Sequence, residues 1–169
     1  MNYQIIQKES ELDILKSKIE QQGEVCFDLE TTSLETHSDH IRILGSGFCC
    51  DESDAFYVPF NGNLDESVAL DFTKEICENS QIGKVGHNLK YDGRVMHRFG
   101  SNIVNIKFDT MIASYCTTGD QTKHNVDDLV LDKFGHLKIR TKSLLARKSK
   151  KNPNPTLADS PFEKVGIYC

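Results

Sequence analysis

The segment at residues 25–30, VCFDLE, restricts the possible structures more than any other part of the sequence. Its residues alternate between apolar and polar positions, and successive side chains of a β-strand point to opposite faces of the sheet. Asp28 and Glu30 therefore project side by side from one face. They lie at the strand end that leads into the turn residues Thr31, Thr32 and Ser33. The apolar face carries Val25, Phe27 and Leu29.

Two neighbouring carboxylates raise each other's pKa unless a cation lies between them. Oxygen ligands in this arrangement suit Mg²⁺ or Mn²⁺. The alternative is an amphipathic strand on which Asp28 and Glu30 simply face solvent. The pair alone favours that alternative, so the metal hypothesis needs a second observation.

Asp92 supplies the second observation. It lies in the predicted helix NLKYDGRVMHRFG, three, four and seven residues before Val95, Met96 and Phe99, on the apolar stripe of that helix. A carboxylate buried there needs a partner or a metal. The helix follows a short apolar strand, so its first turn should lie near a strand end, where Asp28 could also be. The alternative is a hydrogen bond to a core hydroxyl or a backbone amide, but the two segments together favour a metal site.

The order of the predicted elements indicates an α/β domain with a mixed β-sheet, because three early strands precede alternating helices and strands. The 169 residues fit one domain. The expected strands are residues 3–7, 25–30, 41–50, 54–60, 84–87 and 103–108. The expected helices are residues 10–23, 64–78, 88–100, 109–116 and 125–135, and a last helix that begins at the N-cap Ser160.

The charge distribution is uneven although the net charge is only −5. Eight Lys or Arg and no acid lie in residues 133–158. A basic segment on an acidic body suits a protein that holds carboxylates in one place and phosphates in another. We expect residues 138–151 to be mobile and to contact phosphates. Composition alone favours the alternative, a solvated loop that carries lysines.

The cysteines and the apolar runs bear on the compartment. Six cysteines occur without a C-x-x-C pair, so we expect all six to be reduced. No apolar run approaches the roughly 20 residues that span a bilayer. The N-terminus has no secretory signal pattern. We therefore expect a cytoplasmic protein with no membrane association.

Several segments resemble, in order, motifs of the 3′→5′ proofreading exonuclease domain of bacterial DNA polymerase I. FDLETTSL resembles the first motif, KVGHNLKYD the second, and PFEKVGIYC the start of the third. FDTMIASY and KHNVDDLVLDKFG are similar to the helices between the second and third motifs. The family belongs to the tyrosine subclass of the DEDD exonuclease superfamily. The resemblance implies one ribonuclease H-like domain, a mixed β-sheet flanked by helices, over residues 1–169.

The resemblance implies a catalytic role for four residues. Asp28, Glu30 and Asp92 match three of the four metal-binding acids, and Tyr168 matches the tyrosine that orients the attacking water. The implied cofactors are two divalent cations, Mg²⁺ or Mn²⁺, about 3.5–4 Å apart, which clamp the attacking and leaving oxygens. The fourth acid would lie four residues after Tyr168, beyond Cys169. We therefore expect a C-terminally incomplete domain that folds, has a frayed last turn and cuts poorly.

The resemblance also implies residues that bind the substrate. Thr31 matches a threonine beside the primer terminus, and Leu34 an apolar residue that wedges against the terminal base. Asn88 matches the asparagine before the helix of the second motif. His87 has no His or Cys partner at zinc-ligand spacing, so we expect it to contact the substrate or to support a ligand residue.

The implied function is removal of nucleotides from a single-stranded DNA 3′ end, as the proofreading domain of a longer DNA polymerase I that serves DNA replication and repair. A polymerase domain of the same parent chain would be its partner. A ribonuclease D-like enzyme that processes RNA 3′ ends is an alternative, because nothing in the sequence reads a 2′-hydroxyl. An inactive scaffold domain is another. The presence of Asp28, Glu30, Asp92 and Tyr168 favours an enzyme.

Overall fold

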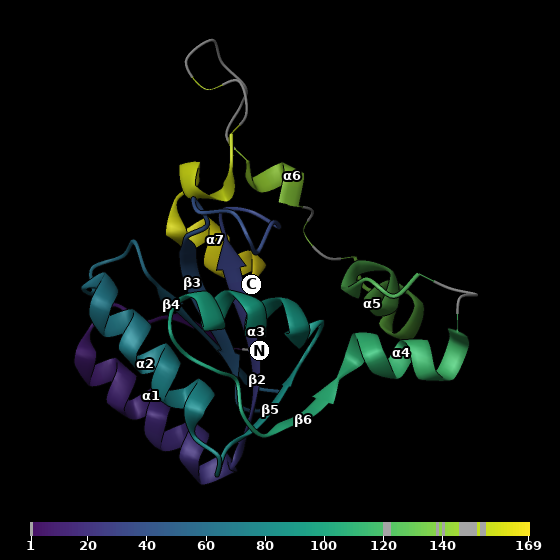
Figure 1. Ribbon diagram of the computed structural model, residues 1–169, viewed down its shortest axis with the longest axis horizontal. Helices are drawn as coiled ribbons and strands as arrows, with labels where there is room; N and C mark the ends of the chain where they lie inside the picture. The colour runs from purple at the N-terminus through teal and green to yellow at the C-terminus, as the bar shows by residue number, and fades with distance from the viewer. Residues whose placement is uncertain (1, 120–122, 138, 140, 146–151, 153–154) are drawn as a thin grey trace.

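The computed structural model describes residues 2–119, 123–137, 139, 141–145, 152 and 155–169 (Figure 1). Much of the basic segment at residues 138–151 lies outside the described residues, so its expected mobility and phosphate contacts stay predictions.

A six-stranded mixed sheet forms the centre of the fold, with the strand order β1-β4-β3-β2-β5-β6. β3 pairs antiparallel with β2 and with β4, whereas β1–β4, β2–β5 and β5–β6 are parallel pairs. The predicted α/β domain with a mixed sheet is therefore confirmed. The strands are β1 (Asn2–Ile5), β2 (Glu24–Thr31), β3 (Ile43–Cys49), β4 (Asp54–Pro59), β5 (Gly83–Gly86) and β6 (Ile106–Asp109).

The helices cover both faces of the sheet, and α4 and α5 extend beyond its β6 edge (Figure 1). None of the helices in the described part of the chain is long and apolar enough to cross a membrane. All six cysteines are free thiols, as predicted. The helices are α1 (Glu9–Gln22), α2 (Glu66–Glu78), α3 (Leu89–Arg98), α4 (Thr110–Thr118), α5 (Val126–Phe134), α6 (Thr141–Leu144), the 3₁₀ helix η2 (Leu157–Asp159) and α7 (Phe162–Tyr168).

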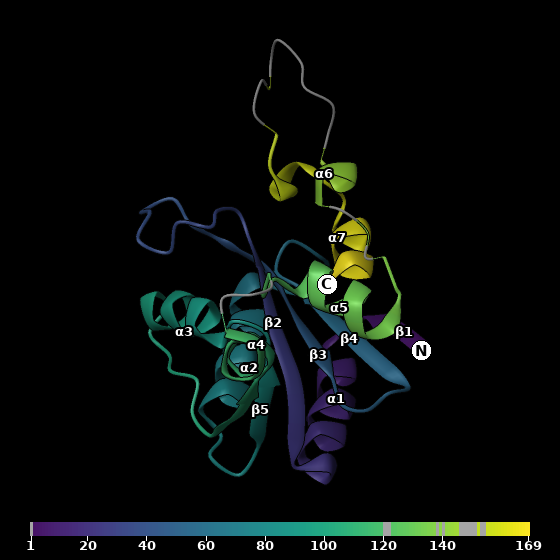
Figure 2. The ribbon, with the colours of Figure 1, turned by 90° about the vertical axis from the view of Figure 1, so that its right-hand side faces the viewer.

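An aromatic chain in the core fixes β2 against its neighbours. The ring of Phe27 lies 5.5 Å from that of Phe48 on β3, which lies 5.7 Å from Phe72 of α2 in an edge-on contact. Fully burying one such side chain contributes about 1.5–3 kcal/mol. Phe27 faces this core, so the next residue, Asp28, must face the opposite side of the sheet, where α7 packs (Figure 2).

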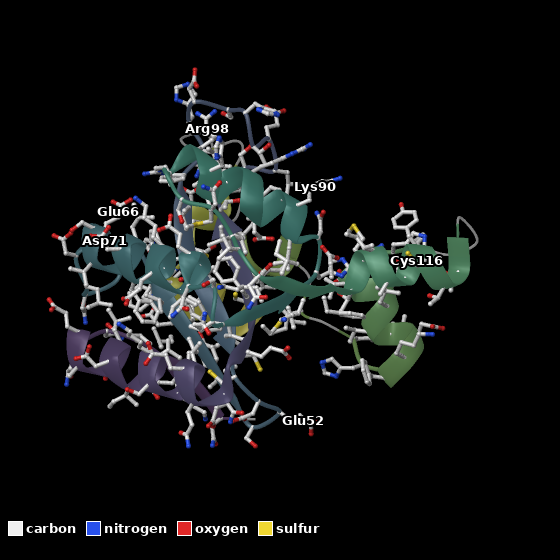
Figure 3. The ribbon with its side chains drawn as sticks, turned by 60° about the horizontal axis from the view of Figure 1, so that its bottom comes forward. Glu52, Glu66, Asp71, Lys90, Arg98 and Cys116 are labelled. Carbon is white, nitrogen blue, oxygen red and sulfur yellow. The ribbon has the colours of Figure 1, made fainter. Side chains whose placement is uncertain are left out.

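Helix α3 shows the predicted division into a buried and an exposed side. Asp92, Val95 and Met96 are buried. Lys90 and Arg98 are exposed on the other side (Figure 3), where the Arg98 guanidinium donates to the His37 carbonyl and to Asp39, each at 3.2 Å. The apolar stripe therefore seats the helix on the core and takes Asp92 inside with it.

Several element ends differ from the sequence expectation. The strand expected at residues 103–108 begins only at Ile106, because Asn105 has a left-handed φ of 56° that interrupts an extended chain. Helix α1 begins at Glu9 and not after Ser10, since Glu11 accepts the backbone N–H groups of Gln7 and Lys8 and the N-cap lies two residues earlier, at Lys8.

The last helix also begins later than expected. Ser160 does not cap α7, because its hydroxyl donates to the Leu144 carbonyl, 2.7 Å away, and α7 starts at Phe162. The expected fraying of the last turn is not seen. Val165 is buried, and the Cys169 N–H donates to the Val165 carbonyl at 3.0 Å. Packing of α7 against β1, β3 and β4 holds this end of the helix.

Asp109 joins the starts of two helices. Its Oδ1 accepts the N–H groups of Met111 and Ile112 at 2.9 and 3.2 Å, which caps α4 as the sequence predicted. The same carboxylate also accepts the N–H groups of Asn88 and Leu89, at 3.1 and 2.8 Å. One buried side chain therefore fixes α4 and the start of α3, the helix that carries Asp92.

We predict that Asp109→Ala lowers the free energy of unfolding by about 2 kcal/mol, because loss of one N-cap typically costs about 1 kcal/mol and two helix starts lose their acceptor. The matched control is Asp65→Ala, which removes the cap of α2 alone and should cost about 1 kcal/mol. Urea unfolding at neutral pH measures both values. Equal losses would contradict the double role of Asp109.

Candidate metal centre

The carboxylates of Asp28 and Glu30 lie side by side near the end of β2, as the strand alternation predicts. One oxygen of each lies within 4.8 Å of the other and of the Cys169 thiol. Asp28 is half-buried, and Glu30 is only 7% exposed. Two carboxylates this close and this shielded repel each other unless positive charge or hydrogen bonds compensate.

Two glycines on β3 leave room above these carboxylates. Gly47 pairs with Asp28 and Gly45 with Glu30 across the strands. A Cβ on Gly47 would collide with the Cys169 thiol, and one on Gly45 would collide with the Tyr57 ring. The absent side chains therefore let α7 and Tyr57 approach the sheet. A cavity of about 440 Å³ remains between the sheet and α7, and Asp28, Gly47, Tyr168 and Cys169 line part of it.

Asp92 fills the gap where β2 and β5 separate. The two strands pair only from Glu24 to Cys26 of β2. Farther along β2, the Leu29 N–H donates to Asp92 Oδ1 at 3.0 Å, so α3 supplies the acceptor that a neighbouring strand would otherwise provide. A strand N–H points in the plane of the sheet. The Asp92 carboxylate therefore lies beside β2 in that plane, and not above one face of the sheet.

The surroundings of Asp92 oppose its ionisation. The side chain is 1% exposed, and this burial raises its pKa well above the usual value. The charge of Asp28 raises the pKa further, whereas the hydrogen bond from Leu29 lowers it. Both sequence interpretations of Asp92 therefore describe part of the structure, since a backbone amide binds it and a second carboxylate lies close to it. Among the described residues, however, the close group of ligand atoms holds Asp28, Glu30 and Cys169 without Asp92.

Thr31 and Leu34 lie on the turn after β2. The Thr31 hydroxyl contacts the Tyr91 hydroxyl and donates to the Ser33 carbonyl at 3.0 Å, and Tyr91 donates to the same carbonyl at 2.7 Å. Leu34 is 89% exposed at the tip that these bonds hold. The sequence interpretation missed Tyr91; its place beside Asp92 on α3 was the available signal.

His87 and Asn88 lie at the junction of α3 with α4. His87 Nδ1 is 2.8 Å from the Thr110 hydroxyl, and Asn88 donates its backbone N–H to Asp109. His87 also lines a separate cavity of about 730 Å³ beside α4 and α5. The described structure does not bring His87 or Asn88 into the Asp28–Glu30 group.

Tyr57 and Tyr168 face the carboxylate side of the sheet. Tyr168 ends α7 and lines the same cavity as Asp28. Tyr57 is 1% exposed, and its hydroxyl has no hydrogen-bond partner in the described part of the chain. Burial raises the pKa of Tyr57, and the nearby charges of Cys169 and Glu30 raise it further, so this hydroxyl stays protonated. The sequence interpretation did not select Tyr57 or Cys169, because only tertiary contacts bring these two residues to the carboxylates.

Comparisons with known proteins bear on the family of the chain. Residues 3–169 match the family model described as 3′-5′ exonuclease. The chain is 28% identical to DNA polymerase I of Pseudomonas aeruginosa, with all of this chain covered, and 30% identical to DNA polymerase I of Synechocystis sp., with 98% covered. It spans only 19% and 17% of the length of these two relatives.

Solved structures share the fold at low sequence identity. Escherichia coli RNase D superposes with a TM-score of 0.67 at 18% identity, over 99% of this chain and 41% of that one. The Trypanosoma brucei RNase D–GMP complex gives 0.72 at 11% identity, over 98% and 53%. Brucella melitensis NrnC with bound Mg²⁺ gives 0.59 at 16% identity, over 99% and 79%.

We predict that Asp92→Asn stabilises the metal-free chain at pH 7. The raised pKa of Asp92 means that the folded state binds this proton more tightly than the unfolded state. The stability that protonated Asp92 contributes is therefore fully present below the pKa of the residue in the unfolded chain, about 3.9. This contribution is lost as the pH rises through the higher pKa of Asp92 in the folded state. Asparagine keeps an oxygen for the Leu29 N–H but carries no charge.

Urea unfolding in the presence of a chelator, from pH 5 to pH 8, tests this prediction. The stability difference between Asp92→Asn and the wild type should grow as pH rises. Asp71→Asn, an exposed aspartate on α2, is the control and should give no such trend. A variant less stable than wild type at pH 7 would show that the Asp92 charge is compensated within the protein.

Proposed function

The chain belongs to the 3′-5′ exonuclease family, and we propose that it removes nucleotides from the 3′ end of single-stranded DNA with two divalent cations, Mg²⁺ or Mn²⁺, as cofactors. Relatives of the chain over nearly its whole length are DNA polymerases I. We therefore propose that the chain is the proofreading domain of such a polymerase. Its cytoplasmic location and the domain bounds 1–169 stay predictions.

The observation that carries the proposal is the grouping of acids around the end of β2. Asp28 and Glu30 present oxygens to one point, and Asp92 lies beside them with a charge that burial and Asp28 both disfavour. A divalent cation would offset this repulsion, and carboxylate oxygens are the ligands that Mg²⁺ and Mn²⁺ prefer. The donor set thus fits the cofactor that the family implies.

The cations would stabilise the negative charge that develops on the attacking and leaving oxygens of the phosphodiester. Asp28 and Glu30 would hold them from β2, and Asp92 would reach them from α3. Tyr168, on the same cavity as Asp28, would orient the attacking water through its hydroxyl. Because it is a phenol and not a carboxylate, it acts by positioning the water.

The turn after β2 would receive the 3′ terminus. Leu34, exposed on a tip that Thr31 and Tyr91 fix, would wedge against the terminal base without reading its identity. Thr31 would lie beside the terminal sugar. His87 and Asn88, at the α3–α4 junction, stay proposed substrate contacts.

The parent protein would carry a polymerase domain that delivers the 3′ end. The chain spans 19% and 17% of the length of the Pseudomonas aeruginosa and Synechocystis sp. enzymes, so most of each relative lies outside the matched region. Proofreading within DNA replication and repair is the role that follows from this association.

We predict that Asp28→Asn lowers the rate of 3′ nucleotide release at least about 100-fold, because loss of even a residue that supports a metal ligand costs about 10–100-fold. The assay is degradation of a 5′-labelled single-stranded DNA in Mn²⁺ with enzyme in excess. Asp71→Asn, with the same chemistry at an exposed site on α2, should match the wild type.

Three outcomes of this assay would contradict the proposal. Equal rates for wild type and Asp28→Asn would remove Asp28 from catalysis. Faster degradation of an RNA of the same sequence would favour a ribonuclease D-like enzyme. No release from DNA or RNA, either by this chain or by its parent protein, would favour the inactive scaffold.

A further inference from the structure

We propose that Tyr57 is a positioning residue for Glu30, whose carboxylate accepts a hydrogen bond from the Tyr57 hydroxyl when it binds a catalytic cation. The bond orients this carboxylate toward the point that it shares with Asp28. The inference rests on the proposed function, because it takes Asp28 and Glu30 as cation ligands. It adds a residue of β4, a strand outside all the segments in which the sequence resembles motifs of the family.

The strand register places the Tyr57 hydroxyl beside Glu30. Tyr57 pairs with Gly47, which in turn pairs with Asp28, so the tyrosine stands on the carboxylate face of the sheet. Its ring extends toward Gly45, where the hydroxyl occupies the place that a Cβ would fill. Gly45 is the partner of Glu30. Because the Cβ positions of opposite residues lie about 4.5–5.5 Å apart, the Glu30 carboxylate, two carbons beyond its Cβ, can reach this hydroxyl.

The Tyr57 hydroxyl is a buried donor that has no acceptor in the metal-free chain. Tyr57 is 1% exposed, and its hydroxyl makes no hydrogen bond to any residue that the structure describes. Buried polar side-chain atoms are nearly always hydrogen-bonded, so an exception calls for an explanation. The phenol keeps its proton because burial raises its pKa. It can therefore donate, and the Glu30 carboxylate is a charged acceptor on the same face of the sheet.

The backbone at Glu30 explains why its side chain needs such support. The register of the β2–β3 pair shifts between Glu30 and Thr31, so regular pairing ends at the residue whose carboxylate must be oriented. Irregularities of this kind change the direction of a side chain and are frequent beside active sites. Carboxylates that bind metals are themselves hydrogen-bonded by neighbouring groups, which fix their orientation. Tyr57 would supply this constraint to Glu30 from β4.

The competing explanation is that Tyr57 only supports α7. Its ring packs so closely against Gly166 that a Cβ there would collide with it and with the Tyr3 hydroxyl. In that case the ring matters and the hydroxyl does not. Tyr57→Phe separates the two roles, because phenylalanine keeps the ring. Tyr3→Phe is the matched control, since it removes a hydroxyl beside the same helix from β1, which pairs with neither β2 nor β3.

Binding of Mn²⁺ to the 169-residue chain, followed by electron paramagnetic resonance, measures the role of the hydroxyl without relying on nuclease activity. We expect Tyr57→Phe to lower the Mn²⁺ affinity at least about 10-fold, because loss of a group that orients a metal ligand costs about 10–100-fold. Tyr3→Phe should bind Mn²⁺ like the wild type. Urea unfolding in a chelator should show that Tyr57→Phe is no less stable than the wild type, since removal of an unpaired hydroxyl breaks no hydrogen bond among the described residues.

The outcomes separate this proposal from the proposed function. Equal Mn²⁺ affinities of Tyr57→Phe and the wild type would overturn the positioning role and leave the proposed function in place. A loss of affinity that Tyr3→Phe shares, or that comes with lower stability of Tyr57→Phe in chelator, would assign the effect to the packing of α7 and would also overturn the role. Failure of the wild type to bind Mn²⁺ would contradict the proposed function and, with it, the role of Tyr57.

Discussion

The hydrogen bond from the Leu29 N–H to the Asp92 carboxylate joins the two elements on which the candidate site depends. It forms where β2 has left β5, so α3 replaces a strand as the partner of β2 at that point. This arrangement brings a third acid to the β2 end that already carries Asp28 and Glu30. Other contacts hold the two elements that this hydrogen bond joins, because Asp109 fixes the start of α3 and the Phe27–Phe48–Phe72 rings fix β2. The accumulated negative charge is the feature that a cation would relieve.

The other edge of β2, which pairs with β3, explains why the site is open. Gly45 and Gly47 remove side chains from β3 where Asp28 and Glu30 project, and α7 approaches closely enough to bring Cys169 to the carboxylates. The hard oxygens and the soft sulfur therefore meet at one point.

Local patterns were sufficient to predict the acids but not their surroundings. The alternation in VCFDLE placed Asp28 and Glu30 on one face, and the stripe of α3 placed Asp92 inside; both placements follow from side-chain periodicity alone. The two roles of Asp109, the bond from Tyr91 to the turn and the position of Cys169 come from tertiary contacts between distant segments. The late start of β6 depends on the conformation of one residue, Asn105, which no periodic pattern encodes.

The most direct test of the central claim is the anomalous scattering of Mn²⁺ in crystals of this chain, measured at the manganese absorption edge. We expect a peak within bonding distance of oxygens of Asp28 and Glu30, on the side of β2 that faces α7, and loss of this peak in crystals of Asp28→Asn. No peak at these carboxylates at saturating Mn²⁺, or a peak that persists in Asp28→Asn, would contradict the claim that the end of β2 is a metal centre.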